Sequence, residues 1–289
     1  MTKTTARHAA DTDNGHAADE PVPASELVPE GEPPRLTDLQ LGQAMRLMKG
    51  SDSVELKATV PAESHRATIQ GLPIDPVEAQ PRQVYFFDTP DLQLNQAGIV
   101  VRARRIAGGR ADTVIKLRPI DPADLRPEIR RQGDFNVEVD VLPGGFVCSG
   151  SFKGRADTDA VEDAVRGKLP LRQLYSKSQR AFYREHAPAG LDLDSLVPLG
   201  PTFLLKGKFA VQMGRKRDLP RILVAEMWLY PDGTRILELS TRCRTDEAFA
   251  VAGATRAYLA EKGIVLASVQ QTKTKTALEY YSAQLTAGA

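Results

Sequence analysis

Residues 54–60, Val-Glu-Leu-Lys-Ala-Thr-Val, alternate strictly between apolar and polar side chains. Successive side chains of a β-strand point to opposite faces, so Glu55, Lys57 and Thr59 share one face and the four apolar residues share the other. The polar face therefore carries both signs of charge. If further strands repeat this pattern, they can close into a barrel lined with Glu, Lys and Arg, which would be a container for phosphate and metal ions.

The same alternation recurs further along the chain, in residues 100–105, 113–118, 136–141, 204–209, 224–228 and 236–242. Charged residues stand at every second position, as the basic pairs Arg102 and Arg104, Lys116 and Arg118, and Lys206 and Lys208, and the acidic pair Glu138 and Asp140. The last two segments flank a Pro-Asp-Gly turn, so a hairpin would bring Glu226 and Glu238 to the same side. The sequence thus predicts at least six strands with one charged face.

An isolated strand of this kind is most often the solvated face of an ordinary antiparallel sheet. In this chain, however, the basic and acidic doublets are segregated by sign between strands. Charges enclosed in a barrel need partners, because an unpaired buried charge costs free energy. A polyanion together with divalent cations would satisfy both sets, since basic side chains bind phosphate oxygens and carboxylates bind metal.

The composition of the 289-residue chain is typical of a soluble, single-domain enzyme with a tail. Its net charge of +1 gives no polybasic surface, so we expect no nucleic-acid partner. No apolar run approaches the roughly 18 residues of a membrane span, and the N-terminus lacks an apolar signal core, so we expect a cytoplasmic protein with no membrane partner. Cys148 and Cys243 form no zinc or disulfide pattern. The histidines form no nucleophile–base constellation and no P-loop motif is present, which disfavours serine or cysteine hydrolases and P-loop phosphate binding.

The chain divides into a tail, a short helix and one main domain. Residues 1–34 are rich in Ala, Asp, Glu, Pro, Thr and His without periodicity, which predicts a disordered tail. Residues 35–50 show helical apolar spacing and predict a helical lead-in to a domain that covers residues 51–286. We expect a solvated loop at 119–133. Further helices, which would cover the apolar outer face of the strands, are expected at 62–70, 157–168, 246–262 and 273–284.

Several segments, taken in order, resemble the CYTH, or triphosphate tunnel metalloenzyme, superfamily, whose members include inorganic triphosphatases, thiamine triphosphatases and class IV adenylyl cyclases. The resemblance spans about residues 52–285. Its opening segment, 53–57, corresponds to the family's Glu-x-Glu-x-Lys motif. The other matching segments are 85–92, 98–104, 113–116, 138–140, 177–183 and 238–240. The resemblance implies an α+β fold, a closed antiparallel eight-stranded β-barrel that forms a tunnel with a charged interior and helices packed outside.

The resemblance also implies a metal-dependent hydrolase of inorganic triphosphate or short polyphosphate. The implied ligands of Mg²⁺ or Mn²⁺ are Glu55, Glu138, Asp140, Glu226 and Glu238, and Glu55 or Glu238 would orient the attacking water. The implied phosphate-binding residues are Lys57, Arg102, Arg104, Lys116, Arg118, Arg180, Lys206, Lys208 and Lys273, with Lys275 as a further candidate. The expected partners are therefore triphosphate, polyphosphate or a nucleoside triphosphate, bound by a monomer or homodimer.

Three positions depart from the family pattern. Ser53 and Ser240 stand where the family has glutamates, and Asn136 stands where a basic residue is expected. Each lost carboxylate removes a negative charge from a site for hard cations. Two alternatives therefore stay open: a class IV-type adenylyl cyclase that makes cyclic AMP from ATP, and a non-catalytic domain that binds polyphosphate or nucleotide.

Overall fold

The computed structural model describes residues 36–213, 220–268, 270 and 272–287, which form one compact unit. The tail expected at residues 1–34 lies outside the described residues. Among the described helices, none is both long and apolar enough to cross a membrane.

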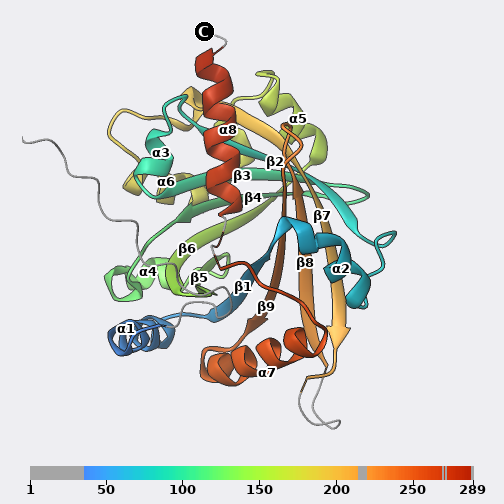
Figure 1. Ribbon diagram of the computed structural model, residues 1–289. Helices are drawn as coiled ribbons and strands as arrows, with labels where there is room; N and C mark the ends of the chain where they lie inside the picture. The colour runs from blue at the N-terminus through green and yellow to red at the C-terminus, as the bar shows by residue number, and fades with distance from the viewer. Residues whose placement is uncertain (1–35, 214–219, 269, 271, 288–289) are drawn as a thin grey trace, which may run out of the picture. The chain divides into compact units, whose positions relative to one another are not determined.

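Nine strands close into a barrel in the described part of the chain, in the order β1-β5-β6-β4-β3-β2-β7-β8-β9 (Figure 1). The strands are β1 (Ser53–Val60), β2 (Gln80–Asp88), β3 (Ile99–Ile106), β4 (Ala111–Leu117), β5 (Phe135–Leu142), β6 (Gly145–Ala156), β7 (Val197–Val211), β8 (Arg221–Leu229) and β9 (Arg235–Cys243). The expectation of an antiparallel eight-stranded barrel is therefore wrong in two respects. There is a ninth strand, and β1 pairs with β5 in parallel.

The charge alternation did not predict strands β2 and β6. β2 contains the uninterrupted run Val-Tyr-Phe-Phe at 84–87, and β6 contains glycines at 145, 150 and 154. A Cβ at Gly150 would lie 2.8 Å from the ring of Phe135, and one at Gly154 would lie 2.6 Å from the side chains of Gln179 and Thr113. These glycines therefore belong to a strand that other side chains approach closely, and their small size hides the strand pattern.

The pairing of β1 explains how distant charged residues meet. Its parallel register with β5 aligns Ser53 with Glu138 and Glu55 with Asp140. Its antiparallel register with β9 aligns Lys57 with Ser240. Residues that face each other in neighbouring strands point to the same side of the sheet, so the charged residues of these strands share one face.

Helices lie around the barrel, as expected. They are α1 (Asp38–Lys49), α2 (His65–Gly71), α3 (Gln93–Gln96), α4 (Pro127–Arg130), α5 (Thr158–Val165), α6 (Lys177–His186), α7 (Ala248–Glu261) and α8 (Lys273–Ala287). Thr37 and Gln40 form a capping box that satisfies free backbone N–H groups at the start of α1. The expected loop at 119–133 holds the short α4 and a 3-10 turn at Pro122–Asp124.

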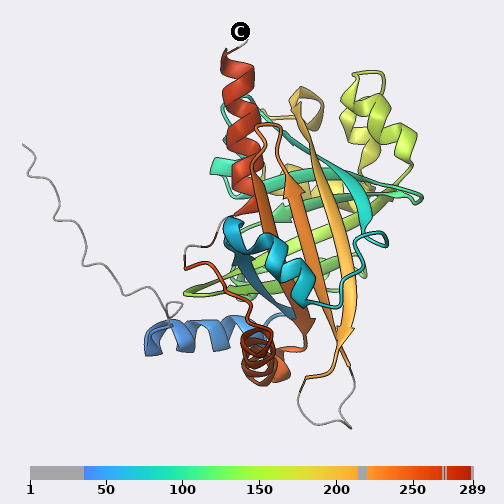
Figure 2. The ribbon, with the colours of Figure 1, turned by 45° about the vertical axis from the view of Figure 1, so that its right-hand side comes forward.

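Apolar residues pack in three clusters. Two of them join the uncharged face of the strands to the surrounding helices; for example, Val54 of β1 packs in one cluster with Met48 of α1. The third contains Leu204 of β7 and Trp228 of β8, together with Leu278 of α8. Leu204 and Trp228 lie two positions from Lys206 and Glu226, so they point to the charged face. Helix α8 therefore packs against apolar residues of the charged face at one end of the long strands, while α7 lies at the other end (Figures 1 and 2).

Candidate active site

Three carboxylates meet where β1 and β5 pair in parallel. Glu55, Glu138 and Asp140 each offer an oxygen atom within 4.8 Å of the other two, and we call them the acidic cluster. The side chain of Asp140 is fully buried. Ser53 donates a hydrogen bond to Glu138 over 3.3 Å, so the serine that stands in the place of a family glutamate is still in contact with the cluster.

Four basic residues surround the acidic cluster. The Nζ atom of Lys57 lies 2.8 Å from Asp140 and 3.1 Å from Glu55. Lys116 and Arg118 lie 3.6 and 3.7 Å from Asp140, and Arg242 pairs with Glu138. Cations and carboxylates therefore offset each other's charge at this site.

The carboxylates of the cluster differ in pKa. Burial acts to raise the pKa of Asp140, but Lys116 and Lys57 outweigh it and lower the pKa to about 2. Burial also opposes ionisation of Glu55, yet Lys57 brings the pKa of Glu55 below its usual value. The pKa of Glu138 is raised, first by burial and then by the nearby charge of Glu55. Glu138 is therefore the member of the cluster that protonates most readily.

A lysine from α8 joins a second carboxylate pair. Glu226 and Glu238 face each other across β8 and β9, and Lys273 Nζ lies 2.7 and 2.6 Å from their oxygens. Lys206 adds a contact of 2.8 Å to Glu226. Burial opposes the charge of Lys273, but Glu226 and Glu238 raise its pKa above the usual value. Both predicted metal ligands thus bind an ammonium group of the chain itself.

Three arginines gather around one aspartate on β2, β3 and β4. Arg104 donates to both oxygens of Asp112, at 2.9 and 2.7 Å. The Nε atoms of Arg82 and Arg102 are buried without a hydrogen-bond partner. Burial and the charge of Arg104 lower the pKa of Arg102 to about 10. The arginine cluster, Arg82, Arg102 and Arg104, therefore holds more positive charge than Asp112 neutralises.

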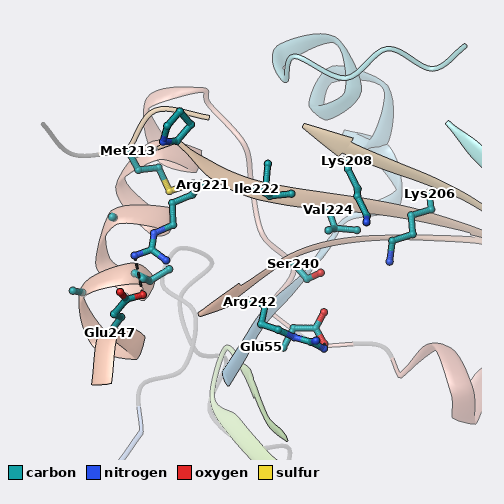
Figure 3. A pocket seen from close by; sticks show the side chains of 14 residues that line it. Glu55, Lys206, Lys208, Met213, Arg221, Ile222, Val224, Ser240, Arg242 and Glu247 are labelled. Carbon is teal, nitrogen blue, oxygen red and sulfur yellow. Dashed lines mark hydrogen bonds and ion pairs between the residues drawn. The ribbon is translucent and has the colours of Figure 1, made fainter. Parts of the chain in front are cut away.

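A cavity of about 920 Å³ opens beside these groups (Figure 3). It lies between strands β7, β8 and β9 and helix α7. Its charged wall contains Glu55, Lys206, Lys208 and Arg242. The cavity thus connects the acidic cluster with two of the predicted phosphate-binding lysines.

Two predicted phosphate-binding residues lie apart from these groups. Arg180 is on α6, where its guanidinium donates to the carbonyl oxygens of Arg172 and Tyr175 over 3.3 and 2.8 Å. The side chain of Lys275 is 66% exposed and pairs with Glu279 on its own helix at 3.6 Å. Both basic groups therefore already have partners outside the charged face.

The sequence prediction missed four residues of the site: Arg82, Asp112, Lys153 and Arg242. Arg242 follows Ser240 by two positions in the same strand, so the alternation of β9 contained the signal for it. Burial lowers the pKa of Lys153, which feels the charges of Arg242, Glu138 and Glu55. Lys153 forms a similar basic doublet with Arg155, but the glycines of β6 obscure the alternation around it.

Solved structures of other proteins share this fold, among them the following two. One is a protein from Hippeastrum, provisionally named as an adenylyl cyclase and described as having a dominant triphosphatase activity. It has 18% identity and a TM-score of 0.56, over 76% of this chain and 92% of that chain. The other, a provisionally named adenylate cyclase from Bacillus halodurans, has 15% identity and a TM-score of 0.52, over 78% of this chain and 97% of that chain.

No family model and no curated protein matches the chain. At the identities of the two solved structures, likeness establishes the fold alone. The resemblance to the CYTH superfamily is therefore confirmed at the level of the fold.

Proposed function

We propose that the protein is a metal-dependent phosphohydrolase that binds a triphosphate along the charged face, inside the barrel. The observation that carries this proposal is the arginine cluster, in which Arg104 alone is hydrogen-bonded to Asp112 while Arg82 and Arg102 each keep a buried Nε without a partner. Guanidinium groups bind phosphate oxygens through paired hydrogen bonds. A bound phosphate would supply the negative charge that this cluster lacks.

The acidic cluster fits a divalent cation by the chemistry of its donor atoms. Glu55, Glu138 and Asp140 present buried carboxylate oxygens close together, and Mg²⁺ and Mn²⁺ prefer oxygen ligands. A cation bound there would supply Lewis-acid polarisation of a phosphoryl oxygen. We propose these three residues as the metal ligands, because each offers an oxygen within 4.8 Å of the other two.

The arginine cluster and Glu55 have different roles in the proposed hydrolysis. Arg82, Arg102 and Arg104 hold phosphoryl oxygens and neutralise charge as it develops. Glu55, which lines the cavity, orients a water molecule; Glu238 is less suitable because it is not among the residues that line the cavity. The water oxygen forms a bond to the terminal phosphorus as the bridging P–O bond breaks, which turns tripolyphosphate into diphosphate and orthophosphate.

The proposal is tested by assaying released phosphate and cyclic AMP together. Tripolyphosphate, ATP and thiamine triphosphate would each be incubated with Mg²⁺ or Mn²⁺. We expect phosphate release that depends on the metal. Cyclic AMP and diphosphate from ATP would instead identify a cyclase, and tight binding without any turnover would identify the non-catalytic alternative.

Glu55→Gln should abolish most of the metal-dependent turnover. The variant keeps the shape of the side chain but removes one charge from the acidic cluster, so we expect kcat to fall about 100-fold and half-activation to need about 10-fold more Mn²⁺. Phosphate release over a Mn²⁺ titration measures both effects. Glu63→Gln, at an exposed glutamate of the next turn, is the control and should behave as wild type. Unchanged metal activation in the Glu55 variant would refute its assigned role.

Affinity for the anion should depend on pH through Lys116. Burial lowers the pKa of Lys116 to about 8, although Asp140 opposes the shift. The free ammonium therefore loses its charge as pH rises through about 8, whereas an arginine stays charged. Between pH 7 and 9.5 we expect wild type to lose about 10-fold more tripolyphosphate affinity than Lys116→Arg, since a charged hydrogen bond contributes about 1.5 kcal/mol or more. Titration calorimetry without metal measures this; identical pH profiles would contradict it.

A further inference from the structure

The cavity beside the acidic cluster has two chemically different walls. One wall is charged and polar, with Lys206, Lys208 and Arg242. The other is apolar and is built from Met213 after β7, Ile222 and Val224 of β8, and Ala250, Val251 and Ala254 of α7. Figure 3 shows Ile222 and Val224 on the strand between Met213 and the two lysines. A phosphate chain matches only the first wall.

Strand β8 shows where one wall changes into the other. Its residues on the charged face run from Glu226 through Val224 to Ile222, because alternate residues share a face. Glu226 contacts Lys206, whereas Ile222, two positions beyond Val224, is 53% exposed. A large aliphatic side chain that remains this accessible in a cavity gains free energy when an apolar ligand group covers it. The face therefore changes from phosphate-binding to apolar towards α7.

The rim and the size of the cavity fit a ligand larger than three phosphates. A volume of about 920 Å³ lies within the range of cavities that hold drug-sized ligands. At the rim, Arg221 of β8 pairs with Glu247, which precedes α7, at 3.1 Å. This pair supplies a few polar groups next to an apolar wall, which is the usual composition of a site for an organic ligand.

We propose that this cavity binds the organic group of a triphosphate ester, so that the preferred substrate is an organic triphosphate. This inference rests on the proposed function, because it assumes that the phosphates lie among the basic residues of the charged face. The organic group packs against Ile222, Val224 and α7, and the phosphate chain extends past Lys208 and Lys206. Inorganic triphosphate would leave the apolar wall exposed to water.

The test compares tripolyphosphate with a panel of ATP, GTP, CTP, UTP and thiamine triphosphate. Ile222→Ser should lower kcat/KM for the best organic substrate about 10-fold and change the value for tripolyphosphate less than 2-fold. Val265→Ser is the matched control, since Val265 is 57% exposed and is not among the residues that line the cavity. It should leave both values unchanged, and thermal melting of each variant reports the fold.

The outcomes separate the two proposals. Equal losses for tripolyphosphate and the organic triphosphates, or a wild type that prefers tripolyphosphate to every member of the panel, would overturn the organic subsite. If nothing is turned over, calorimetry gives the same comparison as binding ratios. Selective binding of an organic triphosphate that Ile222→Ser weakens would then support the subsite while the hydrolase proposal fails. No binding of any triphosphate would overturn both.

Discussion

Arg102→Gln is expected to weaken tripolyphosphate binding about 100-fold. The guanidinium is buried, and its Nε has no hydrogen-bond partner in the free protein, so a phosphate oxygen would be its natural acceptor. A buried hydrogen bond between charged groups contributes a few kcal/mol when one partner is removed. Glutamine retains polarity and much of the length, but it has no charge. Titration calorimetry at neutral pH measures the loss of affinity.

The same variant should not destabilise the fold. Burial and Arg104 lower the pKa of Arg102, which means that its charged form is disfavoured in the free protein and that a neutral residue relieves this cost. The midpoint of thermal unfolding should stay constant or rise. Arg105→Gln is the control, because Arg105, three residues further along β3, lies on the other face of the strand and pairs with Glu162 at 2.9 Å. If both variants lose affinity equally, the arginine cluster is not the phosphate site.

Lys273→Met is expected to lower the free energy of unfolding by about 3–5 kcal/mol at pH 7, because it leaves the buried Glu238 without its lysine and Glu226 with Lys206 as its remaining partner. Lys273 is the group that joins Glu226 to Glu238, and its side chain is 16% exposed. The loss should shrink as pH falls towards 5, because protonation removes the repulsion between the two carboxylates. In wild type the pKa of Lys273 is raised, so the lysine stays charged below pH 10.5 and contributes fully to the free energy of unfolding there. This contribution is lost only at higher pH.

Chemical denaturation at pH 5 and pH 8 measures this loss. Lys275→Met is the matched control, since it removes an exposed lysine two positions further along the same helix and should cost less than about 0.5 kcal/mol. The double variant Lys273→Met with Glu238→Gln should recover part of the stability, because the remaining carboxylate, Glu226, keeps its contact with Lys206. A Lys273 variant as stable as the Lys275 variant would show that the ammonium is not needed between the carboxylates.

The charge alternation predicted much of the barrel, because a period of two residues survives wherever one face is charged and the other apolar. It therefore identified Glu55, Asp140 and Arg102 without any tertiary information. The helix expected at 273–284 is also present, as α8. The resemblance made both Lys273 and Lys275 candidates for phosphate binding, but residues two apart in a helix point in different directions, and Lys273 contacts the carboxylates whereas Lys275 pairs with Glu279.

Pairing between distant strands was the part that local patterns could not give. Nothing in residues 53–60 or 135–142 specifies that β1 and β5 run parallel, since that depends on how the whole sheet closes. The acidic cluster depends on this pairing. Ser53 illustrates this limit of local patterns. The sequence indicates only that a metal ligand is lost there, whereas the structure shows that the Ser53 hydroxyl donates a hydrogen bond to Glu138.

During synthesis, strand β1 leaves the ribosome before the strands with which it pairs. Glu55 aligns with Asp140 in β5 and with Arg242 in β9, far later in the chain. Ribosomes add roughly 5–20 residues per second, so the strand stays without β9 for roughly ten seconds or longer. An unpaired strand can join another chain and aggregate, and charged side chains on its edge discourage this. Glu55 and Lys57 are therefore expected to keep the nascent chain from aggregating before the barrel closes.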